Sequence, residues 1–91
     1  MTITIEYYGP AREAAGFGSE RVEVESATAR LLIAARATHH GGRLAKLLLD
    51  AEGRLKSNIL IAVGDRQVEA DSDVELRDGD EIIIVPPVSG G

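Results

Sequence analysis

Cysteine is absent from the chain, which removes several kinds of chemistry at once. Without thiols there is no disulfide framework, no thiolate nucleophile and no cysteine-ligated metal site. Long apolar runs are also missing, since none approaches the roughly 20 residues that a membrane-spanning helix requires. The opening stretch, MTITIEYYGP, lacks the basic segment and apolar core of a signal peptide. We therefore expect a cytoplasmic protein.

Basic residues are scarce as well. The 10 lysines and arginines are outnumbered by 15 aspartates and glutamates, which gives a formal net charge of −5. Nucleic-acid binding needs clustered cations that displace counterions, so this balance argues against it. An acidic protein more naturally meets a basic surface on a partner protein.

The remaining composition is that of one small folded domain. The 91 residues are 44% hydrophobic and 27% charged, which favours a folded chain with one modest core over a disordered one. No internal repeat, linker or low-complexity tract divides the sequence.

Two segments near the start alternate between apolar and polar residues, which indicates strands with one buried face. In TITIEYY, Ile3, Ile5 and Tyr7 are expected to point inward, and in ERVEVES the inward residues are Val22 and Val24. The two strands are close in the sequence, so an antiparallel pair is the simplest topology. The intervening AREAAG is expected to form one helical turn.

The period changes at Thr28, which is a suitable N-cap for a helix. Leu31, Leu32 and Ala35 are expected to share the buried face of this helix, and Gly41-Gly42 is expected to end it. The segment RLAKLLLDAEG predicts a second, shorter helix.

Three more strands are expected in the second half. NILIAVGDRQVEA indicates a strand, a turn and a short strand, and VELRDGDEIIIVPP indicates a turn followed by a last strand. The order of strand, strand, helix, strand, short strand and strand predicts an α+β domain.

The last strand does not alternate in polarity, because Ile82, Ile83, Ile84 and Val85 follow one another. A strand covered on only one side normally alternates. One main helix cannot cover both faces of a sheet, so either Ile82 and Ile84 or Ile83 and Val85 are expected on an open face. Exposed apolar surface often marks a protein partner, and we assign partner binding to these four residues.

The sequence ends on PPVSGG, directly after this apolar strand. Pro86 and Pro87 cannot extend a sheet, so we divide the chain into a domain of residues 1–85 and a flexible tail of residues 86–91. Gly90 and Gly91 lack Cβ atoms and suit a narrow channel. The carboxylate of Gly91 becomes reactive toward nucleophiles once it is joined to AMP. Because the chain has no phosphate-binding loop, another protein would have to activate it.

Three parts of the chain resemble the small subunit of molybdopterin synthase, a ubiquitin-like sulfur carrier: TITIEYYGPAREAAG, the helix after Thr28, and LRDGDEIIIVPPVSGG. The resemblance covers the whole length and is most specific in DGDE…PPVSGG. It implies a β-grasp (ubiquitin-like) fold, with a mixed sheet of about four to five strands and one main helix packed across one face.

The resemblance also implies a reaction. In that family a ubiquitin-activating-type enzyme uses ATP and magnesium to adenylate the terminal glycine, and a sulfur donor converts it to a thiocarboxylate. The tail then enters the large subunit and gives sulfur to cyclic pyranopterin monophosphate in molybdenum cofactor biosynthesis. Gly91 would therefore carry the sulfur, and the large subunit, the adenylating enzyme and the sulfur donor would be partners. The remaining tail residues would thread the channel or stiffen the tail: Gly90, Ser89, Val88, Pro87 and Pro86.

This chain would then bind no cofactor and have no catalytic machinery of its own. Two other functions fit the same tail: a sulfur carrier for thiamine, cysteine or tRNA thiolation, and a ubiquitin-like modifier that forms isopeptides through Gly91. A non-covalent adaptor would not need a free Gly91. No metal site is expected, because His39 and His40 are adjacent and project about 100° apart on a helix.

Overall fold

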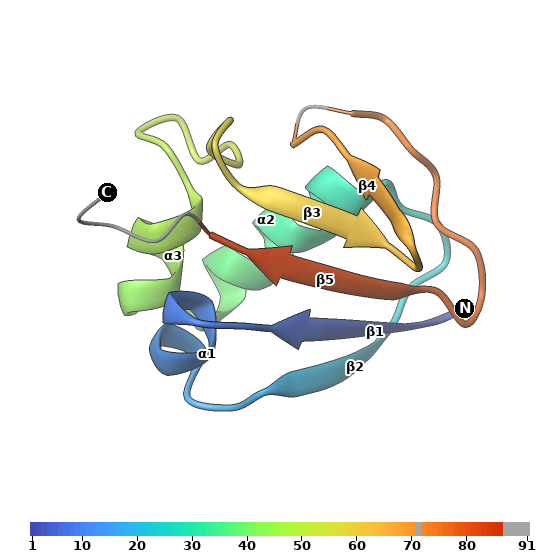
Figure 1. Ribbon diagram of the computed structural model, residues 1–91, viewed down its shortest axis with the longest axis horizontal. Coiled ribbons are helices and arrows are strands. Elements are labelled where there is room, and N and C mark those ends of the chain that lie inside the picture. The colour runs from blue at the N-terminus through green and yellow to red at the C-terminus, as the bar shows by residue number, and fades with distance from the viewer. Residues whose placement is uncertain (71, 87–91) are drawn as a thin grey trace.

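The computed structural model describes residues 1–70 and 72–86, which contain five strands and three helices (Figure 1). In chain order these are β1 (Thr2–Tyr7), α1 (Pro10–Ala15), β2 (Ser19–Glu23), α2 (Ala29–His40), α3 (Gly42–Leu48), β3 (Leu60–Val63), β4 (Arg66–Val68) and β5 (Glu81–Val85). The predicted order of elements is confirmed, and the helical turn and the second short helix expected from the sequence are α1 and α3.

The strands form one mixed sheet in the order β2-β1-β5-β3-β4. β1 and β2 pair in antiparallel fashion, as predicted. β1 and β5 pair in parallel at the centre of the sheet, although they come from opposite ends of the described chain. β3 runs antiparallel to both β5 and β4.

The core lies between one face of the sheet and the helices. In Figure 1, α2 lies behind the sheet and crosses its strands. Strand residues with 1% exposure or less form the floor of this core: Ile3, Ile5, Tyr7, Ile61, Ile82 and Ile84. Because fully burying one such side chain contributes about 1.5–3 kcal/mol, this inner layer fixes which face of each strand points inward.

Helix α2 is rotated relative to the prediction. Thr28 caps it as expected, with its hydroxyl oxygen accepting a hydrogen bond from the N–H of Leu31 at 3.4 Å. Leu32 is buried, but Leu31 and Ala35 are exposed, so the predicted buried face was wrong for these two residues. The row that faces the core has a spacing of four residues: Ala29, Ile33 and Ala37.

Strand β5 presents its two faces differently. Ile82 and Ile84 are in the core, whereas Ile83 and Val85 are half-buried on the side of the sheet opposite α2. The open apolar face predicted from the sequence is therefore confirmed for Ile83 and Val85. Ile82 and Ile84 were also assigned to partner binding, but at 0% and 1% exposure they pack inside the domain and present no surface to a partner.

The predicted tail begins with a packed residue. Pro86 is fully buried and extends the folded body by one position beyond β5. The other tail residues predicted to thread a partner lie outside the described residues: Pro87, Val88, Ser89, Gly90 and Gly91. Their predicted mobility and chemistry stay predictions.

Candidate functional site

Apolar side chains gather on the face of the sheet that carries no helix. The pairing register brings Leu60 opposite Val85 and Ala62 opposite Ile83, with all four on this outer face. Tyr8 follows β1 on the same side and donates a hydrogen bond from its phenol to Glu6, which also points outward. We call these five residues the outer patch: Tyr8, Leu60, Ala62, Ile83 and Val85.

The outer patch is exposed enough to bind another protein. Tyr8 and Leu60 are 44% and 43% exposed, which makes them two of the three large hydrophobic residues most open to solvent in the described part of the chain. Neighbouring apolar side chains that remain this open on adjacent strands favour a protein-binding surface over isolated surface residues.

Tyr8 lies at the border of this patch and forms two hydrogen bonds there. Its backbone N–H donates to the carbonyl oxygen of Ile84 at 3.3 Å, which ties it to the end of β5. The phenol donates to Oε2 of Glu6 at 3.0 Å, and this hydrogen bond raises the pKa of Tyr8 above its ordinary value. The phenol therefore stays protonated at neutral pH and offers an amphipathic ring to a partner.

The outer patch adjoins the start of the predicted tail. Val85 is both a member of the patch and the last residue of β5, and Pro86 follows it directly. Leu60, the first residue of β3, lies opposite Val85 at the same end of the sheet. A protein that covers the patch would thus also contact the end of β5, next to Pro86.

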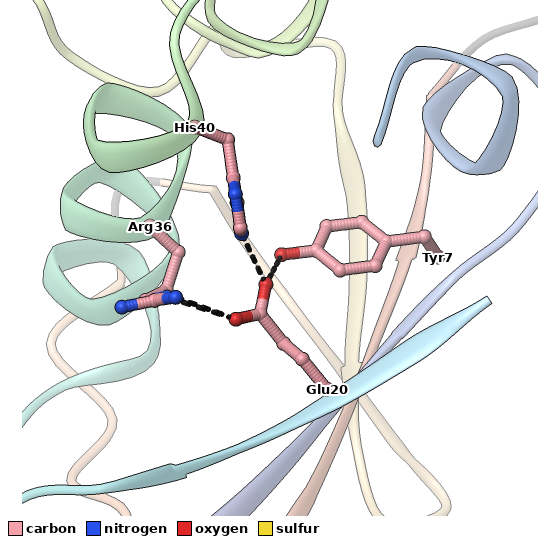
Figure 2. A network of polar contacts seen from close by, with 4 residues as sticks. All are labelled: Tyr7, Glu20, Arg36 and His40. Atoms are coloured by element: carbon pink, nitrogen blue, oxygen red, sulfur yellow. Dashed lines mark hydrogen bonds and ion pairs between the residues drawn. The ribbon is translucent and has the colours of Figure 1, made fainter. Parts of the chain in front are cut away.

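A polar network fixes helix α2 against the sheet (Figure 2). Glu20 on β2 accepts a hydrogen bond from the phenol of Tyr7 at 2.5 Å and contacts Nε2 of His40 at 2.7 Å. Its other oxygen accepts from Nε and Nη2 of Arg36, at 3.1 and 2.7 Å. The ring of Phe17 packs edge-on against Tyr7 and His40, two members of the network.

The network stabilises the charged form of a poorly exposed carboxylate. Burial alone would raise the pKa of Glu20, but hydrogen bonds from Tyr7, His40 and Arg36 outweigh it and lower the pKa overall. Burial and the Glu20 carboxylate raise the pKa of Tyr7 far above its ordinary value, so the phenol remains a donor. These residues join β1, β2 and α2, and their role is structural.

Glu20 was not among the predicted residues, although the sequence contains a signal for its position. Glu20 lies two residues before Val22 and four before Val24, so strand alternation places it on the inward face. A carboxylate in that position needs a cationic or donor partner. Two such partners occur four residues apart on α2, at Arg36 and His40, and lie on one helix face.

Other residues considered for chemistry have structural roles. His40 contacts Glu20, and the described residues contain no group of three or more side chains suited to hold a metal ion. Before β5, Asp78 accepts a hydrogen bond from the N–H of Thr2 at 2.7 Å and Asp80 accepts one from the N–H of Arg77 at 2.8 Å, which is typical of aspartates in turns. No helix in the described part of the chain is long and apolar enough to cross a membrane.

Comparison with known proteins decides the family. The model of the ThiS family matches residues 5–91. The chain belongs to the ThiS family. It is thus a ubiquitin-like sulfur carrier, and the predicted α+β β-grasp fold is confirmed by the mixed five-stranded sheet and by its structural relatives.

Three solved structures illustrate the range of these relatives. SAMP1 from Haloferax volcanii is 25% identical over 100% of both chains, with a TM-score of 0.85. A putative molybdopterin converting factor subunit 1 from Pyrococcus furiosus is 26% identical, covering 97% of this chain and 99% of its own, with a TM-score of 0.60. A chain of the BexX/CysO complex from Amycolatopsis orientalis is 30% identical, covering 98% and 99%, with a TM-score of 0.65.

The three relatives of this ThiS-family chain are a modifier protein, a putative molybdopterin converting factor subunit and a chain of the BexX/CysO complex. The last of these was solved together with another protein. A search of curated protein sequences found no significant match. The family is therefore established, and a protein partner is supported in general terms.

Proposed function

We propose that this protein is the sulfur-carrying small subunit of molybdopterin synthase, with Gly91 as the sulfur-bearing residue. The observation that carries the proposal is the position of the outer patch on the strand that leads into the tail. A partner docked on Ile83 and Val85 would receive the tail at a fixed point. The family match extends to residue 91 and thus spans the tail, which supports a role for its last residues.

The chemistry requires three partner proteins and little from the folded domain. An adenylating enzyme, with its own ATP and magnesium, joins the Gly91 carboxylate to AMP and releases pyrophosphate. A sulfur donor then displaces AMP, which leaves a thiocarboxylate on Gly91. The large subunit accepts the tail and directs the sulfur to cyclic pyranopterin monophosphate. The domain binds no cofactor itself and presents the tail in the cytoplasm.

The assignment to molybdopterin rests on the PPVSGG ending and on the likeness to the Pyrococcus furiosus protein over nearly the whole chain. A sulfur carrier for thiamine, cysteine or tRNA thiolation would use the same fold and tail. The difference lies in the partner, so the decisive experiment identifies the protein that the outer patch binds.

We would purify the protein from its source organism with a tag at the N-terminus and with Gly91 unmodified by added residues. Intact mass should show a fraction that is heavier by the difference between sulfur and oxygen, and the large subunit of molybdopterin synthase should co-purify. If the mature chain carries residues beyond Gly91, or if the heavier fraction is never present, the proposal is wrong. Co-purification of a thiazole, cysteine or tRNA-modifying enzyme alone would move the assignment to that pathway.

Point variants test the docking surface itself. Ile83→Asp places a charge in the middle of the patch and should weaken binding of the large subunit at least about tenfold, as expected for the centre of an interface. Leu31→Asp adds the same charge at an exposed apolar residue of α2, on the helix-covered side of the domain, and should bind like the unchanged protein. Equal binding by both variants would exclude the outer patch as the docking site.

A second candidate function is protein modification, in which Gly91 forms isopeptide bonds with lysines. The observation that favours it is the likeness to SAMP1, a small archaeal modifier protein, with a TM-score of 0.85. A modifier would appear as a ladder of conjugates on other proteins when the purified fraction is separated under denaturing conditions.

A further inference from the structure

Amines are unusually few in this chain, and each can be assessed individually. Lys46 and Lys56 are the only lysines, and all other basic side chains are arginine or histidine. Arginine does not form isopeptides, so these two lysines and the amine of Met1 are the nucleophilic nitrogens that could accept an acyl group.

Lys56 is engaged in holding helix α3. Its ammonium donates a hydrogen bond to the carbonyl oxygen of Lys46 at 2.8 Å, and its backbone N–H donates to the carbonyl oxygen of Leu48 at 2.8 Å. The last carbonyl groups of a helix lack partners within the helix, and Lys56 supplies them from the following loop. Its side chain is half-buried, so acylation of Lys56 would remove a contact that ends α3.

The amine of Met1 is also engaged. It donates to the carbonyl oxygen of Val24 at 2.6 Å, and the N–H of Val24 donates back to the carbonyl oxygen of Met1 at 2.9 Å. This reciprocal pair continues the ladder between β1 and β2 and holds the half-buried amine at the end of the sheet.

Lys46 differs from both. It lies in the last turn of α3 with an exposed side chain, and its ammonium forms no salt bridge with residues 1–70 or 72–86. Helix α3 uses Leu44 and Leu48 to pack toward the core and contacts α1 and α2, so it lies on the helix-covered side of the sheet. Lys46 therefore projects from a different surface than the outer patch.

A shallow hollow of about 400 Å³ borders Lys46. Small side chains line much of it, including Ala45 and Ala51, and a Cβ added at Gly53 would meet no atom within 4 Å. Asp50 also borders the hollow, but its Oδ1 accepts hydrogen bonds from the N–H groups of Glu52 and Arg54 and stabilises the loop after α3. A slender tail that ends in two glycines fits such an open surface without displacing large side chains.

We propose that Lys46 is the site at which this protein accepts an isopeptide bond from the activated Gly91 of a second copy. This inference rests on the second candidate function, protein modification. The neutral amine of Lys46 attacks the carbonyl carbon of the Gly91 acyl-adenylate, which a separate ATP-dependent enzyme supplies. A carbon–nitrogen bond forms, the bond to the phosphate oxygen breaks, AMP leaves with its electron pair, and the amine proton passes to water. The product is a dimer joined covalently between Gly91 of one copy and Lys46 of the other.

The first experiment tests the amines without any enzyme. The folded protein is treated with a limiting amount of an N-hydroxysuccinimide ester of acetyl-PPVSGG, and the modified residues are mapped by peptide mass spectrometry. Lys46 should react at least about fivefold faster than Lys56, the factor that corresponds to one ordinary hydrogen bond. Equal rates at the two lysines, or faster reaction at Lys56, would overturn the proposal.

The second experiment uses the protein in its source organism and compares the unchanged chain with Lys46→Arg and Lys56→Arg. Both substitutions keep the positive charge, and circular dichroism verifies folding. The unchanged protein and Lys56→Arg should form the covalent dimer, whereas Lys46→Arg should not. A dimer that persists in Lys46→Arg refutes the acceptor assignment while modification itself stands. Absence of any conjugate, together with a thiocarboxylate on Gly91, refutes both the acceptor site and the modifier function and leaves sulfur transfer in place.

Discussion

Replacement of Glu20 by glutamine tests whether the network in Figure 2 stabilises the fold through charge. The substitution keeps the shape of the side chain and one carbonyl oxygen, so Arg36 retains a hydrogen bond to an acceptor that is now neutral. It removes the negative charge that two possible cations, Arg36 and His40, contact at 2.7 Å. Any loss of stability therefore measures how much the negative charge of Glu20 contributes to folding, because the substitution leaves almost no cavity.

The expected magnitude follows from the contacts. A hydrogen bond to a charged group contributes about 1.5–3 kcal/mol, against about 1 kcal/mol for a neutral one. The substitution removes the extra strength that a charged acceptor gives to the contacts with Arg36 and His40. The Glu20 side chain is only 12% exposed, so water screens its charge weakly. We expect Glu20→Gln to lower the free energy of unfolding by about 2 kcal/mol, which for a domain of this size lowers the melting temperature by about 10 °C.

The assay is urea denaturation followed by circular dichroism, with Glu25→Gln in the exposed loop after β2 as the matched control. The pH dependence adds a second test. Because the folded state lowers the pKa of Glu20, its contribution is fully present above the unfolded value of about 4.3 and is lost as the pH falls through the folded value. The difference between Glu20→Gln and the unchanged protein should thus shrink toward zero in acid. A difference below about 0.5 kcal/mol at neutral pH, or one that stays constant into acid, would refute the reasoning.

Two further predictions concern helices. Ile33→Ala, at 1% exposure, should cost about 2–5 kcal/mol of unfolding free energy. Leu31→Ala on the same helix, at 53% exposure, should cost less than about 1 kcal/mol. Similar losses for the two variants in thermal or urea unfolding would contradict the observed rotation of α2. Thr28→Ala removes the N-cap of α2 and should lower the free energy of unfolding by about 1 kcal/mol. The control Thr28→Ser keeps the hydroxyl and should be close to the unchanged protein in the same assay. An unchanged melting temperature for the alanine variant would show that the cap contributes nothing.

Much of the sheet could be predicted because its physical signal is local. Ile3, Ile5 and Tyr7 alternate with polar residues, and the structure buries all three. The isoleucine-rich last strand lacks alternation, and the structure leaves one of its faces open. Which face opens depends on where the helices pack, and this cannot be read from β5 alone. The burial of Ile82 and Ile84 follows from the parallel register with β1, in which they lie opposite Ile5 and Tyr7.

The rotation of α2 could not be predicted from periodicity. The helix carries leucine, isoleucine or alanine on nearly every side, so several apolar stripes are possible. Polar partners select among them, because the row of Leu32, Arg36 and His40 must lie beside Glu20 on β2. A long-range polar contact of this kind has no local signature in the sequence of the helix, and only the inward position of Glu20 points to it.

The central pairing of β1 with β5 has a consequence for the protein during its synthesis. While the ribosome is still adding residues before Glu81, β1 and β3 have no strand between them, and the middle of the sheet cannot close. Pairing between such distant segments is also slow, because a long loop must be ordered first. An incomplete copy therefore lacks Ile83 and Val85, and the outer patch forms only after β5 has been made.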